Sequence, residues 1–226
     1  MVSILEKQQS YISKYKNRQW HGQDFENRIH IEEHGRCKEE YDKIIPGKTC
    51  SDFDLVEGYN SEHNISVKTT KTNSVGFGDI NRAYTNFKRE NFKIVIGHYD
   101  TINSVNNTLK FHKITIFDYE PLYFNVLWGN IQLSSLQSFD QYVKGIAPGK
   151  EAQLENQQLW KEKRECIYNK DGLSKFRIDA KIDSKTQRRT QTTIRYNDLL
   201  ESGMSYVVYT SNYKNITLPY VVTKGS

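Results

Sequence analysis

Cysteine is scarce in this chain, and long apolar runs are missing. The three cysteines, Cys37, Cys50 and Cys166, are odd in number and show no paired spacing. This pattern argues against a structural zinc site and favours a reducing compartment. No run of about 18 apolar residues offers a membrane span, and the polar N terminus does not read as a signal peptide. We therefore expect a soluble, cytoplasmic protein with no membrane partner.

Several familiar motifs are also missing. The sequence contains no internal repeat, helix-turn-helix, zinc finger or RNA-binding signature. His30 and His34 are four residues apart, but Glu32 and Glu33 do not complete the pattern of a zinc protease. The net charge of +5 favours contact with polyanions, although many unrelated proteins share such a charge. Composition alone therefore does not identify the ligand.

The length of 226 residues and the residue patterns predict one mixed α/β domain. Apolar spacing predicts a helix over residues 4–19 and a second helix starting at 22–29, with Asp24 near its N-cap. A third helix is expected to open at Gly76–Asp79, with Ile80, Ala83, Tyr84 and Phe87 on one face. The remaining predicted elements are strands at 52–57, 65–70, 92–99, 108–119, 176–183, 206–210 and 220–223, and a helix at 154–168.

The first two of these strands form a probable hairpin that carries reactive side chains. Side chains alternate along a strand, so Asp52 and Asp54 share one face, and Ser66 and Lys68 share one face of the next strand. If the two faces match, the carboxylates and the ammonium converge on one metal ion and one phosphate. The backbone carbonyl of Val67 would be a further oxygen ligand. Mg²⁺ held in this way activates water against a phosphodiester, and a lysine offsets the developing charge.

These residues also carry a resemblance. Asp52-Phe53-x-Leu55, followed by the run Ile65-Ser66-Val67-Lys68-Thr69-Thr70-Lys71-Thr72-Asn73, is similar to the active-site block of EcoRV-like type II restriction endonucleases. That block reads Pro-Asp-Phe-x-Leu, a hairpin, then Asp-x-Lys-Thr-Thr-x-Thr-Asn, and it belongs to the PD-(D/E)xK nuclease superfamily. The match covers residues 52–73, roughly a tenth of the chain. The resemblance implies a mixed β-sheet flanked by helices, Mg²⁺ as cofactor, and catalysis by Asp52 and Lys68.

Two positions depart from the family pattern. Ser51 stands in place of proline, and Ser66 stands in place of the second carboxylate. An active site then needs an acid from elsewhere: Asp54 on the same strand, Asp79 at the start of the following helix, or Glu26 as an accessory glutamate. The alternatives are structural: Asp52, Asp54 and Lys68 as solvated edge-strand residues, Asp79 as a helix-dipole charge, and Glu26 as a surface residue.

A second basic stretch is a candidate for reading DNA. Lys185, Gln187, Arg188, Arg189 and Gln191 combine cations for phosphates with side chains that pair with guanine or adenine edges. A solvated hairpin explains the same pattern equally well. Thr69, Thr70, Lys71 and Asn73 follow the candidate catalytic lysine and are expected to contact phosphates or the minor groove.

The sequence thus predicts a single nuclease domain over residues 1–226, with a catalytic core at about 20–120 and a DNA-recognition part at about 150–226. The resemblance implies Mg²⁺-dependent cleavage of double-stranded DNA at a palindromic site, with 5′-phosphate ends. Cleavage of both strands of a palindrome in turn implies a homodimer. The alternatives are a repair, junction-resolving or homing nuclease of the same superfamily, and a catalytically silent DNA-binding protein.

Overall fold

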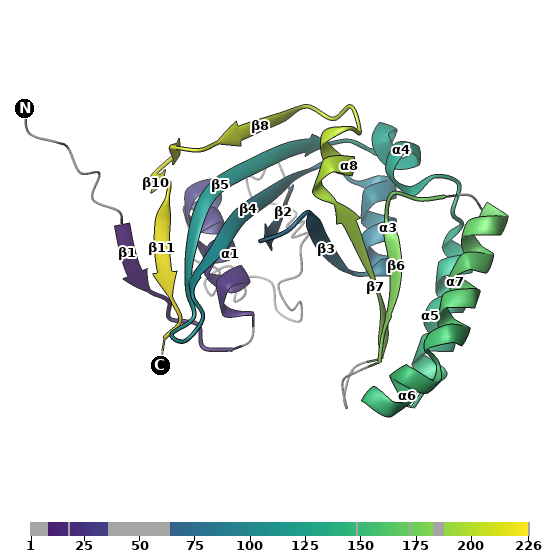
Figure 1. The fold of residues 1–226 in the computed structure, drawn as a ribbon. Coiled ribbons are helices and arrows are strands. Elements are labelled where there is room, and N and C mark those ends of the chain that lie inside the picture. Colours follow the sequence, from purple (N-terminus) through teal and green to yellow (C-terminus); the bar gives the residue numbers. More distant parts are fainter. Residues whose placement is uncertain are drawn as a thin grey trace, which may run out of the picture. The chain divides into compact units, whose positions relative to one another are not determined.

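The computed structural model describes residues 9–17, 19–35, 64–147, 149–171, 173–182 and 188–225. Within them the chain is mixed α/β, with a mixed sheet and flanking helices, as predicted (Figure 1). The chain divides into two compact units. The first contains the described residues up to Thr72, Phe92–Asp118 and the described residues from Ser205 onward; the second contains Asn73–Asn91 and Tyr119–Met204. Among the described helices, none has the length and apolar character needed to cross a membrane.

The first unit is built on a six-stranded sheet in the order β1-β11-β5-β4-β2, with β8 added on β5. β2 pairs in parallel with β4, and β1 pairs in parallel with β11, while β5 is antiparallel to both β11 and β8. The strands are β1 Gln9–Ile12, β2 Asn64–Thr70, β4 Phe92–Asn103, β5 Thr108–Tyr119, β8 Tyr206–Tyr209 and β11 Tyr220–Thr223, with a small hairpin of β9 Asn212–Tyr213 and β10 Ile216–Thr217.

Helix α1 (Trp20–His34) covers one face of this sheet. It ends at Gly35, whose left-handed backbone (φ 67°) lets its N–H bond to the carbonyl of Ile31. Phe25 of α1 is fully buried and stacks on Phe111 of β5 with 5.2 Å between ring centroids. The ring reaches the sheet because β4 carries Gly97 directly beneath it. Burial of these aromatic rings fixes the helix on the sheet.

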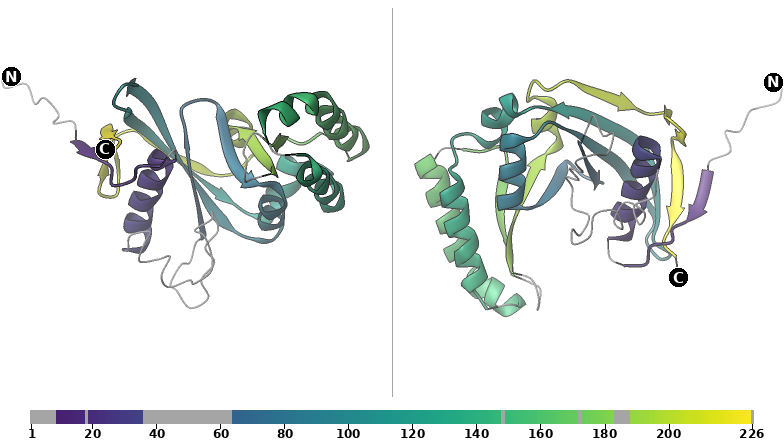
Figure 2. Two further views of the ribbon diagram at one scale, coloured as in Figure 1. Left: turned by 90° about the horizontal axis from the view of Figure 1, so that it is seen from below. Right: turned by 180° about the vertical axis from the view of Figure 1, so that it is seen from behind.

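The second unit contains a three-stranded antiparallel sheet in the order β3-β7-β6. Its strands are β3 Ser74–Asp79, β6 Arg177–Lys181 and β7 Arg189–Arg195. Its helices are α3 Ile80–Arg89, the short 3₁₀ helix η1 Pro121–Tyr123, α4 Phe124–Trp128, α5 Leu133–Gly145, α6 Lys150–Glu155, α7 Gln157–Asp171 and α8 Tyr196–Leu200. Helices α5 and α7 lie side by side (Figures 1 and 2).

Aromatic side chains form the core of the second unit. Trp128 stacks on Phe176 at 4.3 Å between centroids, and Phe87 meets Phe176 edge-on at 5.0 Å. The buried face of α3 consists of Ile80, Ala83, Tyr84 and Phe87, as its spacing predicted.

Several predicted elements differ from the structure. Residues 9–12 of the expected first helix form strand β1 instead, because β11 supplies a parallel partner for them. Gly76–Asp79 belongs to strand β3, so α3 begins only at Ile80. Asp24 lies inside α1, which starts after Gln19, and pairs with Arg28 at 3.0 Å. The strand predicted at 108–119 is present as β5 and is largely buried, because it pairs with β4, β11 and β8. The predicted strand at 52–57 lies outside the described residues.

Replacing Gly97 by alanine should lower the free energy of unfolding by about 1–3 kcal/mol. The added methyl group would lie 2.7–2.8 Å from atoms of the Phe25 ring, which cannot retreat because it stacks on Phe111. Urea unfolding measures the effect.

Gly76→Ala is the matched control, since no atom lies within 4 Å of its added methyl group. A shift within about 0.5 kcal/mol is expected for it. In a double-mutant cycle, Phe25→Leu should relieve part of the Gly97→Ala cost. Strict additivity of the two substitutions would contradict the proposed clash.

Candidate active-site strand

Strand β2 has two chemically different faces. Ile65 and Val67 pack in the core under α1, and the Thr69 hydroxyl lies 3.8 Å from where a Cβ on Gly22 of α1 would sit. Because side chains alternate along a strand, Ser66, Lys68 and Thr70 point to the opposite face. The predicted strand at 65–70 is present, and alternation along it puts Ser66 and Lys68 on one face.

On β4 the same face carries Ile94, Ile96 and His98, of which only His98 is polar. The parallel register sets Lys68 beside Ile96 and Thr70 beside His98, and neighbours in register project to the same side. Lys68 is only 9% exposed. A nearly buried ammonium is stable only where carboxylates or other acceptors compensate its lost hydration. A lysine in this setting is not a solvated edge-strand residue.

Ser66 is the most enclosed polar residue of the strand. It is 0% exposed, and its hydroxyl has no hydrogen-bond partner among the described residues. A buried hydroxyl without a partner costs about 1–3 kcal/mol. This oxygen therefore favours an additional polar group, water or ion beside it.

His98 is a buried, uncharged neighbour of this face. Burial lowers its pKa to about 3, and the positive charges of Lys113 and His112 act in the same direction. Its Nε2 lies 3.2 Å from the hydroxyl of Thr115 on β5, with the donor set by the tautomer. The imidazole is thus neutral at pH 7 and contributes hydrogen bonds rather than charge.

Glu26 belongs to α1, on the opposite side of β2 from Lys68. Glu26, Gly22 and His30 lie one helical turn apart, on the stripe of α1 that faces β2. The Glu26 carboxylate is 17% exposed and lies 4.0 Å from Nε2 of His30. The structure therefore does not put Glu26 on the same strand face as Ser66 and Lys68.

Two predicted metal ligands, Asp52 and Asp54, lie outside the described residues. The side chain of Val67 packs in the core, which leaves its backbone carbonyl as the only group suited to the predicted role. Within the described ranges, no group of three or more histidine, cysteine, aspartate and glutamate residues could hold a metal ion.

The residues after β2 form a tight turn. The Thr70 hydroxyl donates to the carbonyl of Thr72 at 2.9 Å and accepts from the Thr72 N–H at 3.1 Å. Lys71 is exposed at this turn. The pKa of the nearby His21 is lowered by burial and by the charge of Lys71. Lys71 is thus an accessible cation, whereas the Thr70 hydroxyl is engaged in shaping the turn.

Asp79 and Asn73 belong to the second unit and have structural partners there. The Asp79 carboxylate caps α3 by accepting from the N–H of Arg82 at 3.0 Å. Asn73 holds the start of α8: its side-chain oxygen accepts from the N–H of Asn197 at 3.1 Å, and its carbonyl accepts from the N–H of Tyr196 at 2.8 Å. Both side chains therefore stabilise helix N-termini.

The predicted DNA-reading stretch forms part of the β6–β7 pair. Arg189 and Gln191 lie on the more exposed face of β7, and Gln191 pairs with Asp179 of β6. Arg188 precedes the strand and donates to the carbonyl of Ile146 at 3.0 Å. Lys185 and Gln187 lie outside the described residues.

The second unit contains a buried carboxylate that was not predicted. Asp140 on α5 is 3% exposed and accepts from Asn81 at 3.2 Å, from the N–H of Thr190 at 3.0 Å and from Lys144 at 2.6 Å. It ties α3, α5 and β7 together. Only register and packing identify it, because a lone Asp on a helix carries no sequence signal.

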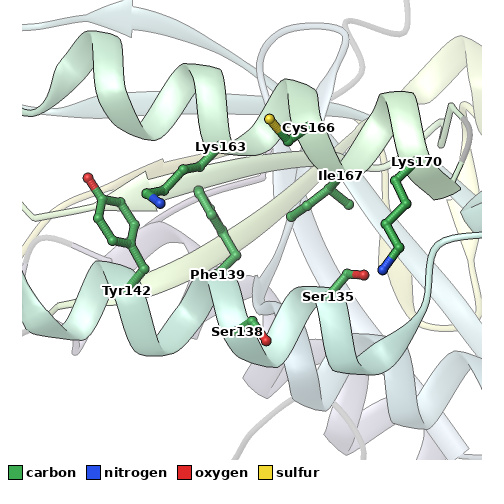
Figure 3. Close-up of a pocket in the computed structure, with 8 residues that line it drawn as sticks. All are labelled: Ser135, Ser138, Phe139, Tyr142, Lys163, Cys166, Ile167 and Lys170. Carbon is green, nitrogen blue, oxygen red and sulfur yellow. The ribbon is translucent and has the colours of Figure 1, made fainter.

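A hollow of about 280 Å³ lies between α5 and α7 (Figure 3). Lys163 and Lys170 extend into it from α7, on either side of Cys166, and Ser135 faces them from α5. The ammonium of Lys163 lies 4.6 Å from the centre of the Tyr142 ring, a cation–π contact. Among the described residues that line the hollow, none is acidic.

No protein-family model matches the chain, and neither the curated proteins nor the solved structures compared with it gave a match.

Replacing His98 by glutamine should weaken the dependence of stability on acid. The folded pKa of about 3 lies below the ordinary value of 6.5, so the unfolded chain binds the proton more readily. The stability that this histidine contributes is present above pH 6.5 and is lost as pH falls toward 3. Between pH 6 and 4, unfolding of the wild type should bind more protons than unfolding of the variant, by at most about one proton.

Urea unfolding at a series of pH values measures this difference. Parallel stability curves for wild type and His98→Gln would show that His98 is not held neutral.

Proposed function

We propose that the protein is a Mg²⁺-dependent type II restriction endonuclease with a PD-(D/E)xK-like core. The observation that carries the proposal is Lys68: a lysine that is only 9% exposed, on the same strand face as the buried Ser66. This strand leads directly into the Thr-Thr-Lys-Thr-Asn segment of the family resemblance. The strand pairs in parallel with β4, and a crossover that contains helix α3 joins the two strands. This arrangement supports the proposal, because the family resemblance implies a mixed sheet flanked by helices.

Lys68 would hold the attacking water and offset the negative charge that develops on the phosphate. Its burial strengthens such an interaction, because electrostatic effects grow where water is excluded. The same burial calls for a carboxylate nearby. Asp52 and Asp54 are the proposed partners, since the family resemblance sets Asp52 opposite the lysine.

The residues of β2 would supply only part of a magnesium site, because the strand offers oxygen atoms but no carboxylate. The ion prefers oxygen ligands, and the Ser66 hydroxyl is an enclosed oxygen without a described partner. The Val67 carbonyl and the carboxylates of Asp52 and Asp54 would complete the set. When bound, Mg²⁺ supplies charge to a phosphodiester and lowers the pKa of a coordinated water.

The serine at position 66 requires a second acid from elsewhere. Asp54 remains a candidate. Asp79 is also a candidate, but it would have to serve as a ligand while it caps α3. Glu26 would act in a supporting role from α1.

The proposed substrate is double-stranded DNA in the cytoplasm. The segment after Lys68 would contact the DNA near the cut through Thr69, Thr70, Lys71 and Asn73. The basic stretch of the second unit would contact it through Lys185, Gln187, Arg188, Arg189 and Gln191. Cleavage of both strands of a palindrome favours a homodimer. Strand β8 supports this, because Tyr206, Val207 and Val208 expose 45%, 51% and 42% of their surfaces. Large exposed apolar residues on an edge strand are suited to self-association.

One observation favours a second candidate, a catalytically silent DNA-binding protein. The position that normally carries the second carboxylate is a serine with no exposed surface. Binding that persists in EDTA, without cleavage in Mg²⁺ or Mn²⁺, would support this candidate. Nicking of branched substrates would instead support a junction-resolving nuclease.

Lys68→Ala should lower DNA cleavage at least about 100-fold, since the variant loses the charge that stabilises the transition state. DNA binding in EDTA should remain close to that of wild type. Digestion of plasmid and phage DNA of known sequence, followed by mapping of the ends, measures the cleavage.

Lys110→Ala is the matched control, because Lys110 is a half-buried lysine on a different strand, β5. It should cut normally. Lys68→Arg keeps the positive charge, so it is the second variant in case Lys68→Ala does not fold. It should also lose most of the cleavage activity, since the bulkier guanidinium changes the geometry. Undiminished cutting by folded Lys68→Ala contradicts the assignment.

Ser66→Ala separates a functional hydroxyl from a packing residue. Removing a buried hydroxyl without a partner should leave the free energy of unfolding unchanged or raise it by about 1–3 kcal/mol. Cleavage should nevertheless fall roughly 10-fold, the worth of one hydrogen bond to a charged group. Unfolding and digestion are measured on the same preparation, and cleavage equal to wild type would show that Ser66 only fills space.

A further inference from the structure

A cationic pocket lies on the second unit, at one end of the β3-β7-β6 sheet. Its volume is about 660 Å³, and three positively charged side chains line it: Lys175, Arg177 and Arg195. Asp198 is the one carboxylate among the described residues of the lining. Ser74 and Thr193 add hydroxyl groups. The lining therefore favours an anion.

The sheet register creates this pocket. Ser74 of β3 pairs with Arg195 of β7, and Thr193 pairs with both Gly76 and Arg177. Alternation puts these residues on the more exposed face of the sheet. Lys175 joins them from the segment before β6, where its N–H donates to the carbonyl of Leu127 at 2.9 Å.

The arginines are held in place by carboxylates without being hidden. Arg195 makes two 2.8 Å hydrogen bonds to Asp198, which is itself buried. These bonds to Arg195 hold the pKa of Asp198 below its usual value, and the charge of Lys175 contributes. Arg195 uses its Nε and Nη2 for this pair and retains other N–H donors. Arg177 pairs with Asp179 at 2.9 Å, and 67% of its side chain is still exposed.

A second pair of cations lies farther along the same sheet face. Lys181 of β6 pairs with Arg189 of β7, four residues from Thr193. At about 3.4 Å per residue the two cationic rows are roughly 14 Å apart. This spacing is close to the major-groove width of about 12 Å, which admits a two-stranded ribbon. Gln191 lies between the rows, and its register neighbours are Asp79 of β3, which caps α3, and Asp179 of β6, which pairs with Arg177.

We infer that the cationic pocket of Lys175, Arg177 and Arg195 binds a backbone phosphate of duplex DNA. The choice of duplex DNA as the ligand rests on the proposed function, whereas the pocket's preference for an anion does not. The pair of Lys181 and Arg189 would meet the backbone across the groove, with Gln191 toward the base edges. Phosphate contacts position a protein on the duplex without reading its sequence. A free phosphate is the other source of the same chemistry, but a single phosphate leaves the second cationic row without a role.

The test is duplex binding in EDTA by the double variant Lys175→Ala/Arg177→Ala. Arg195 is left intact, because its removal would leave the buried Asp198 without its partner. Binding should weaken about 10- to 100-fold, as expected for the loss of charge-assisted hydrogen bonds. The loss should be equal for all DNA sequences, and the salt dependence should decrease by about one phosphate contact.

The matched control is Lys163→Ala/Lys170→Ala in the hollow between α5 and α7 (Figure 3). It removes the same charge from the same unit and should bind duplex nearly as wild type does. If both double variants weaken binding equally, only net charge matters and the inference is overturned. Calorimetry with inorganic phosphate separates the two sources. Phosphate binding that only the pocket variant loses, together with unchanged duplex affinity, would assign the pocket to a small phosphate and overturn the DNA assignment.

These outcomes are distinct from those that test cleavage. Wild-type cutting in Mg²⁺, with normal duplex binding by the pocket variant, leaves the proposed function intact and removes the pocket from it. Weakened binding by the pocket variant, with no cutting by wild type in any divalent metal, supports the pocket and refutes the nuclease.

Discussion

The pleat of strand β2 is the constraint on which the candidate site depends. One side of the strand is fixed by α1, because Ile65 and Val67 are held in the core that forms around Phe25. Because side chains alternate along the strand, Ser66 and Lys68 then point to the other side of the sheet. A shift of register by one residue would turn the lysine toward α1 and move Ile65 and Val67 out of the core. Core packing and the position of the ammonium are therefore one property of the fold.

The two units present their cations in opposite ways. Lys68 is enclosed, so its charge acts strongly over a short distance and demands a compensating carboxylate. Arg177 and Arg195 are exposed and are oriented by acids at their sides. Exposed cations act on a polyanion mainly through the release of its counterions, and salt weakens them. The first arrangement suits chemistry at one phosphate, and the second suits holding a long, charged ligand.

Residue patterns within single helices and strands predicted those features of the fold that depend on the periodicity of one element. The buried face of α3, the alternation of β6 and the strands at 65–70 and 92–99 are all confirmed, because each depends on neighbours within one element. Residues 9–12 were predicted as helix because their strand partner, β11 at residues 220–223, is far away along the sequence. For the same reason His98 and Arg195 escaped notice. The partner of His98, Thr115, and the register neighbour of Arg195, Ser74, are set by tertiary packing and strand pairing, which a single sequence does not display.

Strand β11 lies between β1 and β5, although it is the last described strand along the chain. A growing polypeptide must therefore carry β1 and β5 without the strand that separates them until residue 223 leaves the ribosome. During that interval the long β5 lacks one of its neighbours, and its backbone groups are open to other chains. Assembly of the first unit is thus delayed until almost all of the described sequence has been translated, so a shortened product would contain helices of the second unit but an unfinished main sheet.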